Sequence, residues 1–400
     1  MINIKQQFII TIFMVCINIS FSDELNALLS DTQTKIYEYD IQKNNLNSDI
    51  LENEWIKPIE LKYEKNYSEQ YIDTKTKTGS FSIGVNQPIF KFGGIHYGIR
   101  HAKALRMANK AQIDSKKRAL VIDAVKYLFE IRKIKLQQQK QLLLIKNDKI
   151  DIKQKHESYK AGLLESSFLN QAILTKNRDN NILLELETRL AQVEHQFALI
   201  SDKNPSNITL PKFKLLSMRE YENENLDLLY HRFNKKVKAY KAKMTWTKYL
   251  PTFSLQARYV SEDINPLYVG YGINEKYYYY GFMISMPLDM NMFSKVEADK
   301  VMHLRAETEM IENQKNIKKE YLLVQNKLKF INKKIKLAKR DAKLYKRLYK
   351  VTKNNIYAGE KTLLDSKIMF NTLKVRELDQ KIYDIDKQIT LLSLYRKMSV

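Results

Sequence analysis

The sequence predicts a mixed but mainly α-helical chain, in which two long helical hairpins are each preceded by a pair of β-strands. Three observations predict this class. Two long stretches are almost free of helix-breaking residues, apolar and polar residues alternate ahead of each stretch, and the whole order occurs twice. The chain is therefore expected to fold as an internal duplication.

The two stretches without helix breakers are 99–204 and 288–400, and each contains no proline and one glycine. Within a helix, glycine costs about 1 kcal/mol and proline about 3 kcal/mol, so their absence predicts long helices. The single glycines, Gly162 and Gly359, are expected to mark the bends. From Gly98 to Gly162 the first leg would extend roughly 95 Å at 1.5 Å per residue.

The two bends resemble each other, because each contains an Ala-Gly pair that follows a tyrosine. The pairs Ala161-Gly162 and Ala358-Gly359 lie 197 residues apart, and Pro88 lies 199 residues before Pro287. The return legs also match, with apolar residues at alternating spacings of 3 and 4 that form one seam along each helix. These residues are Leu183, Leu186, Leu190, Val193, Phe197 and Ile200 in the first leg, and Val375, Leu378, Ile382, Ile385, Ile389 and Leu392 in the second.

Two segments ahead of each helical stretch show period-two alternation, which predicts β-strands with one apolar face. Runs of about ten residues with tyrosines near their ends match transmembrane barrel strands with an aromatic girdle. Four strands cannot close a barrel alone, so two or three chains would share one. In the first pair, a polar turn expected at 73–78 separates the apolar positions Leu61, Tyr63, Tyr67 and Tyr71 from Phe81, Ile83 and Val85. In the second pair, a loop with Pro266, Gly270 and Gly272 separates Phe253, Leu255, Ala257 and Tyr259 from Tyr280, Phe282, Ile284 and Met286.

Residues 1–22 are typical of a secretory signal peptide, with Lys5 in a charged start, an apolar run at 8–17 and a small-x-small cleavage site at 20–22. Cys16, the only cysteine, lies within it, so the mature chain should have no disulfide. A lipid-modified Cys16 is the alternative, but Val15 stands where a small residue should precede such a cysteine.

The expected organisation is two repeats, 23–205 and 206–400. Each would contain a short helix, a β-hairpin and a helical hairpin. In the first repeat these lie at 23–54, 59–88 and 95–204 with a tip near 162, and in the second at 221–249, 251–288 and 294–400 with a tip near 359.

The formal charge of +23 first suggests nucleic-acid binding. The lysines are spread along the predicted helices, however, so a solvated helix surface explains them better, and no nucleic-acid partner is expected. After the signal no stretch reaches the ~20 apolar residues of a transmembrane helix, so any membrane span would be made of strands. The 6 histidines show no metal-binding spacing and no catalytic motif occurs, so we expect no enzyme, cofactor or metal site.

The order of signal, short helix, hairpin and helical arm, followed by the same again, resembles the TolC family of outer-membrane factors over essentially the whole mature chain. The segment from Gln87 to Gly94, Gln-Pro-Ile-Phe-Lys-Phe-Gly-Gly, is similar to the family's strand-to-helix signature. Leu-Pro-Thr-Phe-Ser-Leu at 250–255 is similar to its strand-opening segment. The segments 161–164 and 358–359 resemble its periplasmic helix tips.

This resemblance implies a homotrimer in the outer membrane of a Gram-negative bacterium, with twelve strands around a pore and twelve helical legs around a periplasmic tunnel. The duct would passively conduct exported substrates in a tripartite efflux or type I secretion system. Its partners would be outer-membrane lipid, a periplasmic adaptor and an inner-membrane pump of the RND or ABC type, with pump and adaptor selecting drugs, metals or proteins.

The resemblance also implies site residues. Asp365 would form a three-fold carboxylate ring at the tunnel entrance. Its three carboxylates would repel one another and attract cations. Lys361 and Ser167 would belong to the polar network that closes the entrance. The adaptor would contact the tip residues Tyr159, Ala161, Gly162, Leu163, Leu164, Tyr357, Ala358 and Gly359.

Some residues depart from the family's pattern. Phe168 replaces a frequent acidic partner, Ile368 replaces a second ring acid, and the segment 286–289 lacks the glycine pair of its counterpart. A simpler interpretation makes the two tip glycines helix-ending caps and Asp365 a first-turn acid favoured by the helix dipole. The alternative function is a periplasmic or surface coiled-coil scaffold without channel activity, which would not need outward apolar strand faces.

Overall fold

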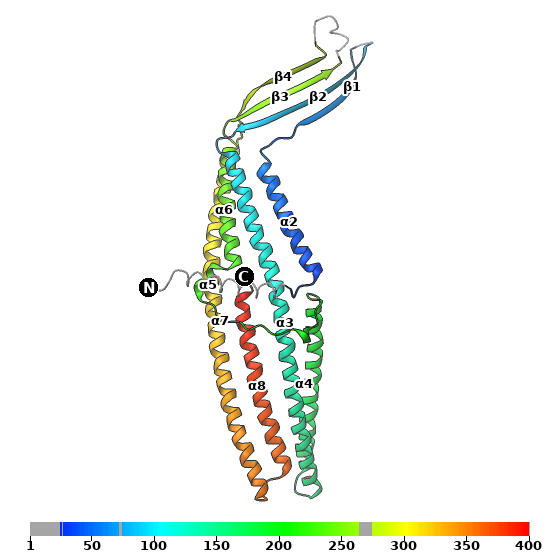
Figure 1. Ribbon diagram of the computed structural model, residues 1–400, viewed down its shortest axis with the longest axis vertical. Coiled ribbons are helices and arrows are strands. Elements are labelled where there is room, and N and C mark those ends of the chain that lie inside the picture. Colours follow the sequence, from blue (N-terminus) through cyan, green and yellow to red (C-terminus); the bar gives the residue numbers. More distant parts are fainter. Residues whose placement is uncertain (1–24, 26, 72–73, 264–273, 400) are drawn as a thin grey trace, which may run out of the picture. The chain divides into compact units, whose positions relative to one another are not determined.

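The computed structural model describes residues 25, 27–71, 74–263 and 274–399, and in this part of the chain long helices accompany a four-stranded antiparallel sheet (Figure 1). The predicted fold class is thereby confirmed. The predicted signal peptide with Cys16, and the predicted loop with Pro266, Gly270 and Gly272, lie outside the described residues. Within them, no helix has an 18-residue window apolar enough to cross a membrane.

The same order of elements occurs in both halves of the chain. The first half contains α2 (Asp31–Asn53), β1 (Glu60–Tyr71), β2 (Thr74–Phe90), α3 (Gly94–Lys160), α4 (Ser166–Ala198) and the short η1 (Pro205–Asn207). The second contains α5 (Met218–Asn223), α6 (Leu226–Thr247), β3 (Thr252–Glu262), β4 (Lys276–Ser285), α7 (Met292–Tyr357) and α8 (Leu363–Tyr395).

The elements divide into two compact units that cut across both halves. Unit 1 comprises the described residues of 1–38, 114–226 and 315–400, and unit 2 comprises those of 39–113 and 227–314. Each unit therefore combines matching segments from both halves. The reason is packing: for example, Lys140 of α3 pairs with Asp379 of α8 at 2.7 Å, so the helical hairpin of one half packs on that of the other.

The sheet of unit 2 has the strand order β1-β2-β3-β4. Strand β2 differs from the prediction at both ends. It begins at Thr74, so most of the turn expected at 73–78 is strand, and it ends at Phe90 beyond the expected end at Pro88. Pro88 has no N–H to donate, and the register with β3 shifts between Pro88 and Phe90.

The helices of unit 2 pack through small side chains and a few polar bonds. Ala104 and Ala108 of α3 are buried against Val237 of α6. The amide of Asn44 in α2 donates to the carbonyl oxygen of Arg106 at 3.0 Å. Small residues at the contact allow the helix backbones to approach closely, and this fixes the helix ends from which the strands begin.

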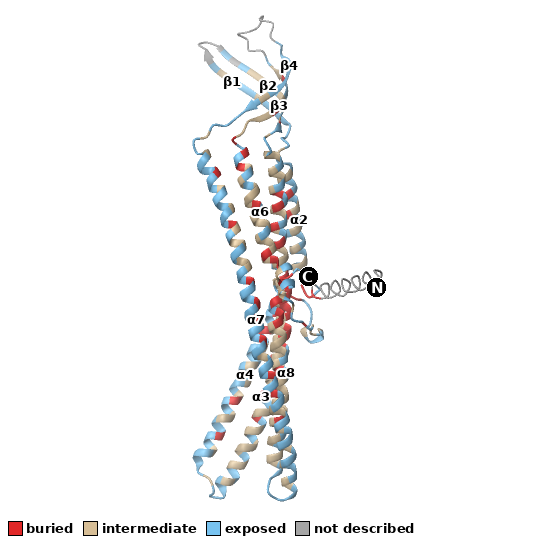
Figure 2. Ribbon diagram, turned by 90° about the vertical axis from the view of Figure 1, so that its left-hand side faces the viewer, coloured by how far each residue is buried: buried red, intermediate tan, exposed pale blue. Residues whose placement is uncertain are grey.

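The helices of unit 1 bury the predicted seams. The seam residues of both return legs, α4 and α8, are buried or half-buried, so this prediction is confirmed. The middle of α3 contributes many of the fully buried apolar residues, among them Val121, Ala124 and Val125. Toward the tips the helices become largely exposed or half-buried (Figure 2).

The helix expected at 221–249 is interrupted, which corrects the prediction. Helix α5 ends at Asn223 and α6 begins at Leu226. Between them the chain pairs with the C-terminal segment, because the N–H of Leu226 donates to the carbonyl of Lys397 at 2.7 Å and that of Ser399 to the carbonyl of Glu224 at 2.8 Å. The backbone cannot make these bonds and continue as one helix.

Candidate functional site: the hairpin tips, the two-faced sheet and its basic cavity

The first helical hairpin turns at Gly162 in the first tip, which we define as the turn 161–165 between α3 and α4. The N–H of Leu163 donates to the carbonyl of Ser158 at 2.9 Å, and that of Gly162 donates to the carbonyl of Tyr159 at 2.9 Å. Gly162 has φ +70°, which glycine adopts without the penalty of a side chain. This is the Schellman ending of a helix.

The second tip, the turn 358–362 between α7 and α8, has the same geometry. The N–H of Glu360 donates to the carbonyl of Asn355 at 2.9 Å, and that of Gly359 to the carbonyl of Ile356 at 3.1 Å. Gly359 has φ +76°. Both glycines are therefore helix caps, as the simpler interpretation predicted. The contact of the tips with an adaptor stays a prediction.

Both tips present apolar side chains to solvent. Leu163 is 81% exposed and Tyr357 is 82% exposed, although burial is the favourable state of such side chains. Leu164 is half-buried. Further exposed apolar and aromatic residues at the tips and the adjoining helix ends are Tyr159, Ala161, Phe168, Ala358 and Leu363.

Asp365 lies in the first turn of α8 and forms a capping box with Thr362. Its carboxylate accepts a hydrogen bond from the N–H of Thr362 at 2.9 Å, and its own N–H donates to the Thr362 hydroxyl at 3.2 Å. The amide of Gln154 in α3 donates to the second carboxylate oxygen at 3.1 Å. The bond from the Thr362 backbone holds the pKa of Asp365 below its usual value. Asp365 is thus a charged carboxylate that caps α8.

The other two gate candidates lie near different tips. Lys361 is exposed in the second tip, and its charge lowers the pKa of Asp365 further. Ser167 is exposed at the start of α4, where its hydroxyl bonds to the carboxylate of Glu165 at 3.5 Å. Among the described residues no hydrogen bond joins Ser167 to Lys361 or Asp365, so a shared network would require more than one chain.

The strand register assembles one continuous apolar face from all four strands. Tyr63 pairs with Phe81, Ile83 with Tyr259, and Leu255 with Phe282. This brings most of the predicted apolar positions of both hairpins to the same side of the sheet; Tyr71 lies beyond a register shift in β1, and Met286 lies beyond the end of β4. Along β4 the face is open, since Tyr280 is 81% exposed and Phe282 is 78% exposed.

The opposite face of the sheet is polar. The register places Lys62 beside Ser82, Asn86 beside Gln256, and Gly84 beside Arg258. A Cβ at residue 84 would lie 2.9 Å from Nε of Arg258, so only glycine leaves room for this side chain. A sheet with one apolar and one polar face separates a lipid-like environment from water.

A second exposed apolar surface runs along α7, and we call it the α7 seam. Its five residues, Leu323, Phe330, Leu337, Leu344 and Val351, lie at intervals of seven and are 44–62% exposed. A seven-residue repeat keeps the same face toward a neighbouring helix when the helices supercoil. The α7 seam therefore has the spacing of a coiled-coil contact surface.

The two halves join the sheet to the helices in different ways. After β2, Phe92 and Gly93 have φ values of 46° and 87°, and the N–H of Gly94 donates to the carbonyl of Lys91 at 2.7 Å. This left-handed turn starts α3. A Cβ at Gly94 would lie 2.9 Å from the Thr247 hydroxyl, so the glycine allows α3 to begin close to the end of α6.

After β4, where the glycine pair is missing, Asp289 starts the helix instead. Its carboxylate accepts a hydrogen bond from the N–H of Asn291 at 2.8 Å and an ion pair from Lys295 at 2.6 Å. Bonding from Lys295 lowers the pKa of Asp289. An Asx turn at Asp289, just before the helix, thus replaces the left-handed turn of the first half.

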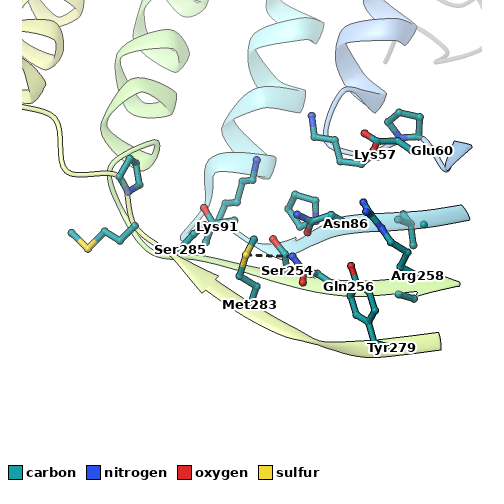
Figure 3. Close-up of a pocket in the computed structure, with 18 of the residues that line it drawn as sticks. Lys57, Glu60, Asn86, Lys91, Ser254, Gln256, Arg258, Tyr279, Met283 and Ser285 are labelled. Carbon is teal, nitrogen blue, oxygen red and sulfur yellow. Dashed lines mark hydrogen bonds between the residues drawn. The ribbon is translucent and has the colours of Figure 1, made fainter. Parts of the chain in front are cut away.

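A cavity of about 700 Å³ lies on the polar face, where the strands meet the helices (Figure 3). Its charged lining residues are four cations and one carboxylate: Lys57, Lys91, Lys248 and Arg258 against Glu60. Burial, together with the charges of Lys57 and Lys248, lowers the pKa of Lys91, and Glu54 opposes this shift. We call these residues and their lining the basic cavity.

Unit 1 contains two carboxylates in contrasting surroundings, one on α8 with cationic partners and one on α3 without them. Asp379 of α8 is buried and compensated, because it pairs with Lys140 at 2.7 Å and with Arg376 at 3.2 Å. Asp148 of α3 lacks such a partner, and within the described chain one of its carboxylate oxygens is buried without a hydrogen bond. Burial and the neighbouring Asp179 raise the pKa of Asp148 to about 6.

These features define the class of the protein: a chain of helical hairpins and β-hairpins that exposes apolar side chains on its sheet, on α7 and near its tips. No protein-family model and no curated protein matches the sequence. Solved structures do match. The outer-membrane protein VceC of Vibrio cholerae is 13% identical, with a TM-score of 0.74 over 94% of this chain and 96% of that chain.

Two further structures agree. The outer-membrane channel OprN is 13% identical, with a TM-score of 0.75 over 94% of this chain and 89% of that chain. The CmeC outer-membrane channel of Campylobacter jejuni is 13% identical, with a TM-score of 0.73 over 93% of this chain and 84% of that chain. The chain has the fold of these TolC-like outer-membrane channels, and the predicted resemblance is confirmed at the level of the fold.

Sequence reasoning missed two surfaces. The α7 seam has a signal in the sequence, because its apolar residues recur every seven positions from Leu323 to Val351. The basic cavity has none. Its lysines come from three separate segments, and only the fold brings Lys57, Lys91 and Lys248 to one place.

Proposed function

We propose that the chain is one third of a passive outer-membrane duct of the TolC type in a Gram-negative bacterium. The observation that carries this proposal is the two-faced sheet, apolar across all four strands on one side and polar on the other, on a chain with the fold of outer-membrane channels. Lipid would contact the apolar face and water would fill the space along the polar face.

The sheet would close only with other copies of the chain. In the described structure β1 pairs with β2 alone and β4 with β3 alone, so each has an open edge. Unpaired backbone groups are costly in lipid, and joining β1 of one copy to β4 of the next satisfies them. Three copies would form a barrel of twelve strands.

The helices would associate in the same trimer. The α7 seam exposes apolar residues at coiled-coil spacing, and a helix of a second copy is the occupant that the spacing fits. The helical legs of three copies would then surround a periplasmic tunnel that is continuous with the pore.

The tips would serve contact and gating. Exposed apolar side chains such as Leu163 and Tyr357 offer a docking surface for a periplasmic adaptor, which would link the duct to an inner-membrane pump of the RND or ABC type. Three copies of Asp365 would form the carboxylate ring at the entrance, with Lys361 and Ser167 in the closing network. The system would serve efflux or type I secretion.

Lipid contact is tested with one charge on either face of the sheet. Phe282→Lys places a charge on the apolar face and should prevent recovery of the protein from outer membranes, since such a charge costs about 2–4 kcal/mol in mid-bilayer. Ser82→Lys places the same charge on the polar face and should leave recovery unchanged. Equal recovery of both variants would contradict the assignment of the faces.

Conduction and gating are tested in planar bilayers with the detergent-purified full-length protein. We expect trimers with a small conductance. Asp365→Asn removes the charge and keeps an oxygen that can accept from Thr362, whereas Thr362→Ala weakens the cap and keeps the charge. A change of cation permeability in Asp365→Asn alone supports the ring, and no conductance from folded protein would refute the duct.

A further inference from the structure

The three lysines of the basic cavity differ from several other lysines of unit 2, which form ion pairs. Lys235 pairs with Glu307 at 2.5 Å and Lys295 with Asp289 at 2.6 Å. By contrast, among the described residues the ammonium groups of Lys57, Lys91 and Lys248 have no carboxylate oxygen within 4.0 Å. Like charges kept together without partners raise the local affinity for anions.

The fold holds this cluster in place from two sides. The side-chain oxygen of Gln87 accepts from the N–H of Lys57 at 2.9 Å, and its amide donates to the carbonyl of Trp55 at 3.0 Å. Gln87 thereby fastens the segment before β1 to the end of β2, next to Lys91. On the sheet, Gly84 leaves the space that Arg258 occupies. The backbone of Lys57 and the side chain of Arg258 are therefore held in place by these contacts.

The lining also offers contacts for more than a simple ion. Tyr279 and Met283 of β4 and Pro88 of β2 border the cavity beside the cations (Figure 3). At about 700 Å³ the cavity is large enough for an organic molecule. The arrangement fits a solute with one anionic group and an organic body.

We propose that the basic cavity binds the anionic group, a carboxylate, sulfate or phosphate, of solutes that move along the polar face of the sheet. Bound there, anionic solutes are enriched relative to cations at the junction of sheet and helices. The role in passage rests on the proposed function, in which the polar face lines the conduit. The binding of anions does not depend on conduction.

Binding is measured first by fluorescence quenching in detergent, with Trp55 as the reporter. Trp55 lines the neighbouring pocket together with Lys57, Lys91 and Lys248, and Trp246→Phe removes the other tryptophan. In the triple variant with glutamine at the three lysines, the quenching constant of iodide should fall about twofold or more, while that of neutral acrylamide stays unchanged. Potassium phosphate should suppress iodide quenching only in the chain that keeps the lysines.

Two controls keep the test independent of folding defects. Glutamine at Lys329, Lys333 and Lys336 of α7 removes the same number of charges elsewhere and should leave iodide quenching unchanged. Glu60→Gln removes the carboxylate of the cavity and should raise iodide quenching. The proposal is overturned if iodide quenches Trp55 as strongly in the triple cavity variant as in the chain that keeps the three lysines. It is also overturned if Glu60→Gln does not change iodide quenching.

Ion selectivity measured in planar bilayers then separates the proposed duct from the proposed anion site. A reversal potential that favours anions, and that shifts toward cations in the triple cavity variant, supports both. If iodide quenching depends on the lysines but no variant conducts, the anion site stands and the duct fails. If the protein conducts but neither quenching nor selectivity changes in the triple variant, the duct stands and the anion site is refuted.

Discussion

Asp148 in α3 provides a test of how the first helical arm is stabilised. Its carboxylate lies in a partly buried position beside Asp179, and its pKa is raised from 3.8 to about 6. A raised pKa means that the folded chain holds the proton more tightly than the unfolded chain. The stabilisation by protonated Asp148 is therefore complete below about pH 4 and is lost as the pH rises through about 6.

The magnitude follows from the shift. At about 1.4 kcal/mol per pKa unit, the rise would correspond to about 3 kcal/mol for a fully buried group. Asp148 is only half-buried, and solvent screening reduces this to about 1–2 kcal/mol. Asp148→Asn removes the charge and can donate to Asp179, so it should stabilise the protein by about this amount at neutral pH.

The assay is thermal unfolding of the detergent-purified protein, followed by far-ultraviolet circular dichroism at a fixed heating rate. Asp148→Asn should raise the midpoint by about 1–3 °C at pH 7.5, and this gain should shrink at about pH 5. Glu157→Gln, an exposed change on the same helix, is the matched control and should shift neither midpoint. A gain of the same size at both pH values would refute the reasoning.

Three further variants, and one control variant, test the caps and the buried charges by the same melting assay. Gly162→Ala should destabilise by about 1–2 kcal/mol, because nothing crowds its Cβ and the positive φ alone is penalised; an unchanged midpoint would contradict the cap. Asp365→Ala should cost about 1 kcal/mol near neutral pH, an effect that disappears as acid protonates the carboxylate, whose pKa is lowered in the fold. Asp379→Asn leaves two cations unpaired and should cost about 1–3 kcal/mol, whereas Glu377→Gln, in an exposed ion pair, should cost under about 0.5 kcal/mol.

The two halves of the chain solve the same structural problems with different residues. The first half begins its long helix with the left-handed turn at Phe92 and Gly93, and the second with the carboxylate of Asp289. Of the two return helices only α8 begins with a capping box, since the side chain of Glu165 accepts no backbone N–H at the start of α4. The two tips therefore present different surfaces.

The sequence by itself determined the helices, the strands and the bends. Helix length depends on the absence of glycine and proline, and the tip glycines are required by a local positive φ, so residues near one another in the chain decide these features. The alternation along each strand is equally local. These patterns therefore predicted the fold class, the duplication and the places of both tips.

The tertiary structure alone decided what separate segments do together. The register between hairpins places Ile83 beside Tyr259 and makes one apolar face of four strands. Chain pairing at the C-terminus interrupts the helix expected at 221–249. Packing also gathers the three lysines of the basic cavity, which no spacing predicts. Such contacts form between segments that are distant in the sequence. Burial and hydrogen bonding across the whole chain determine which of these segments pack together.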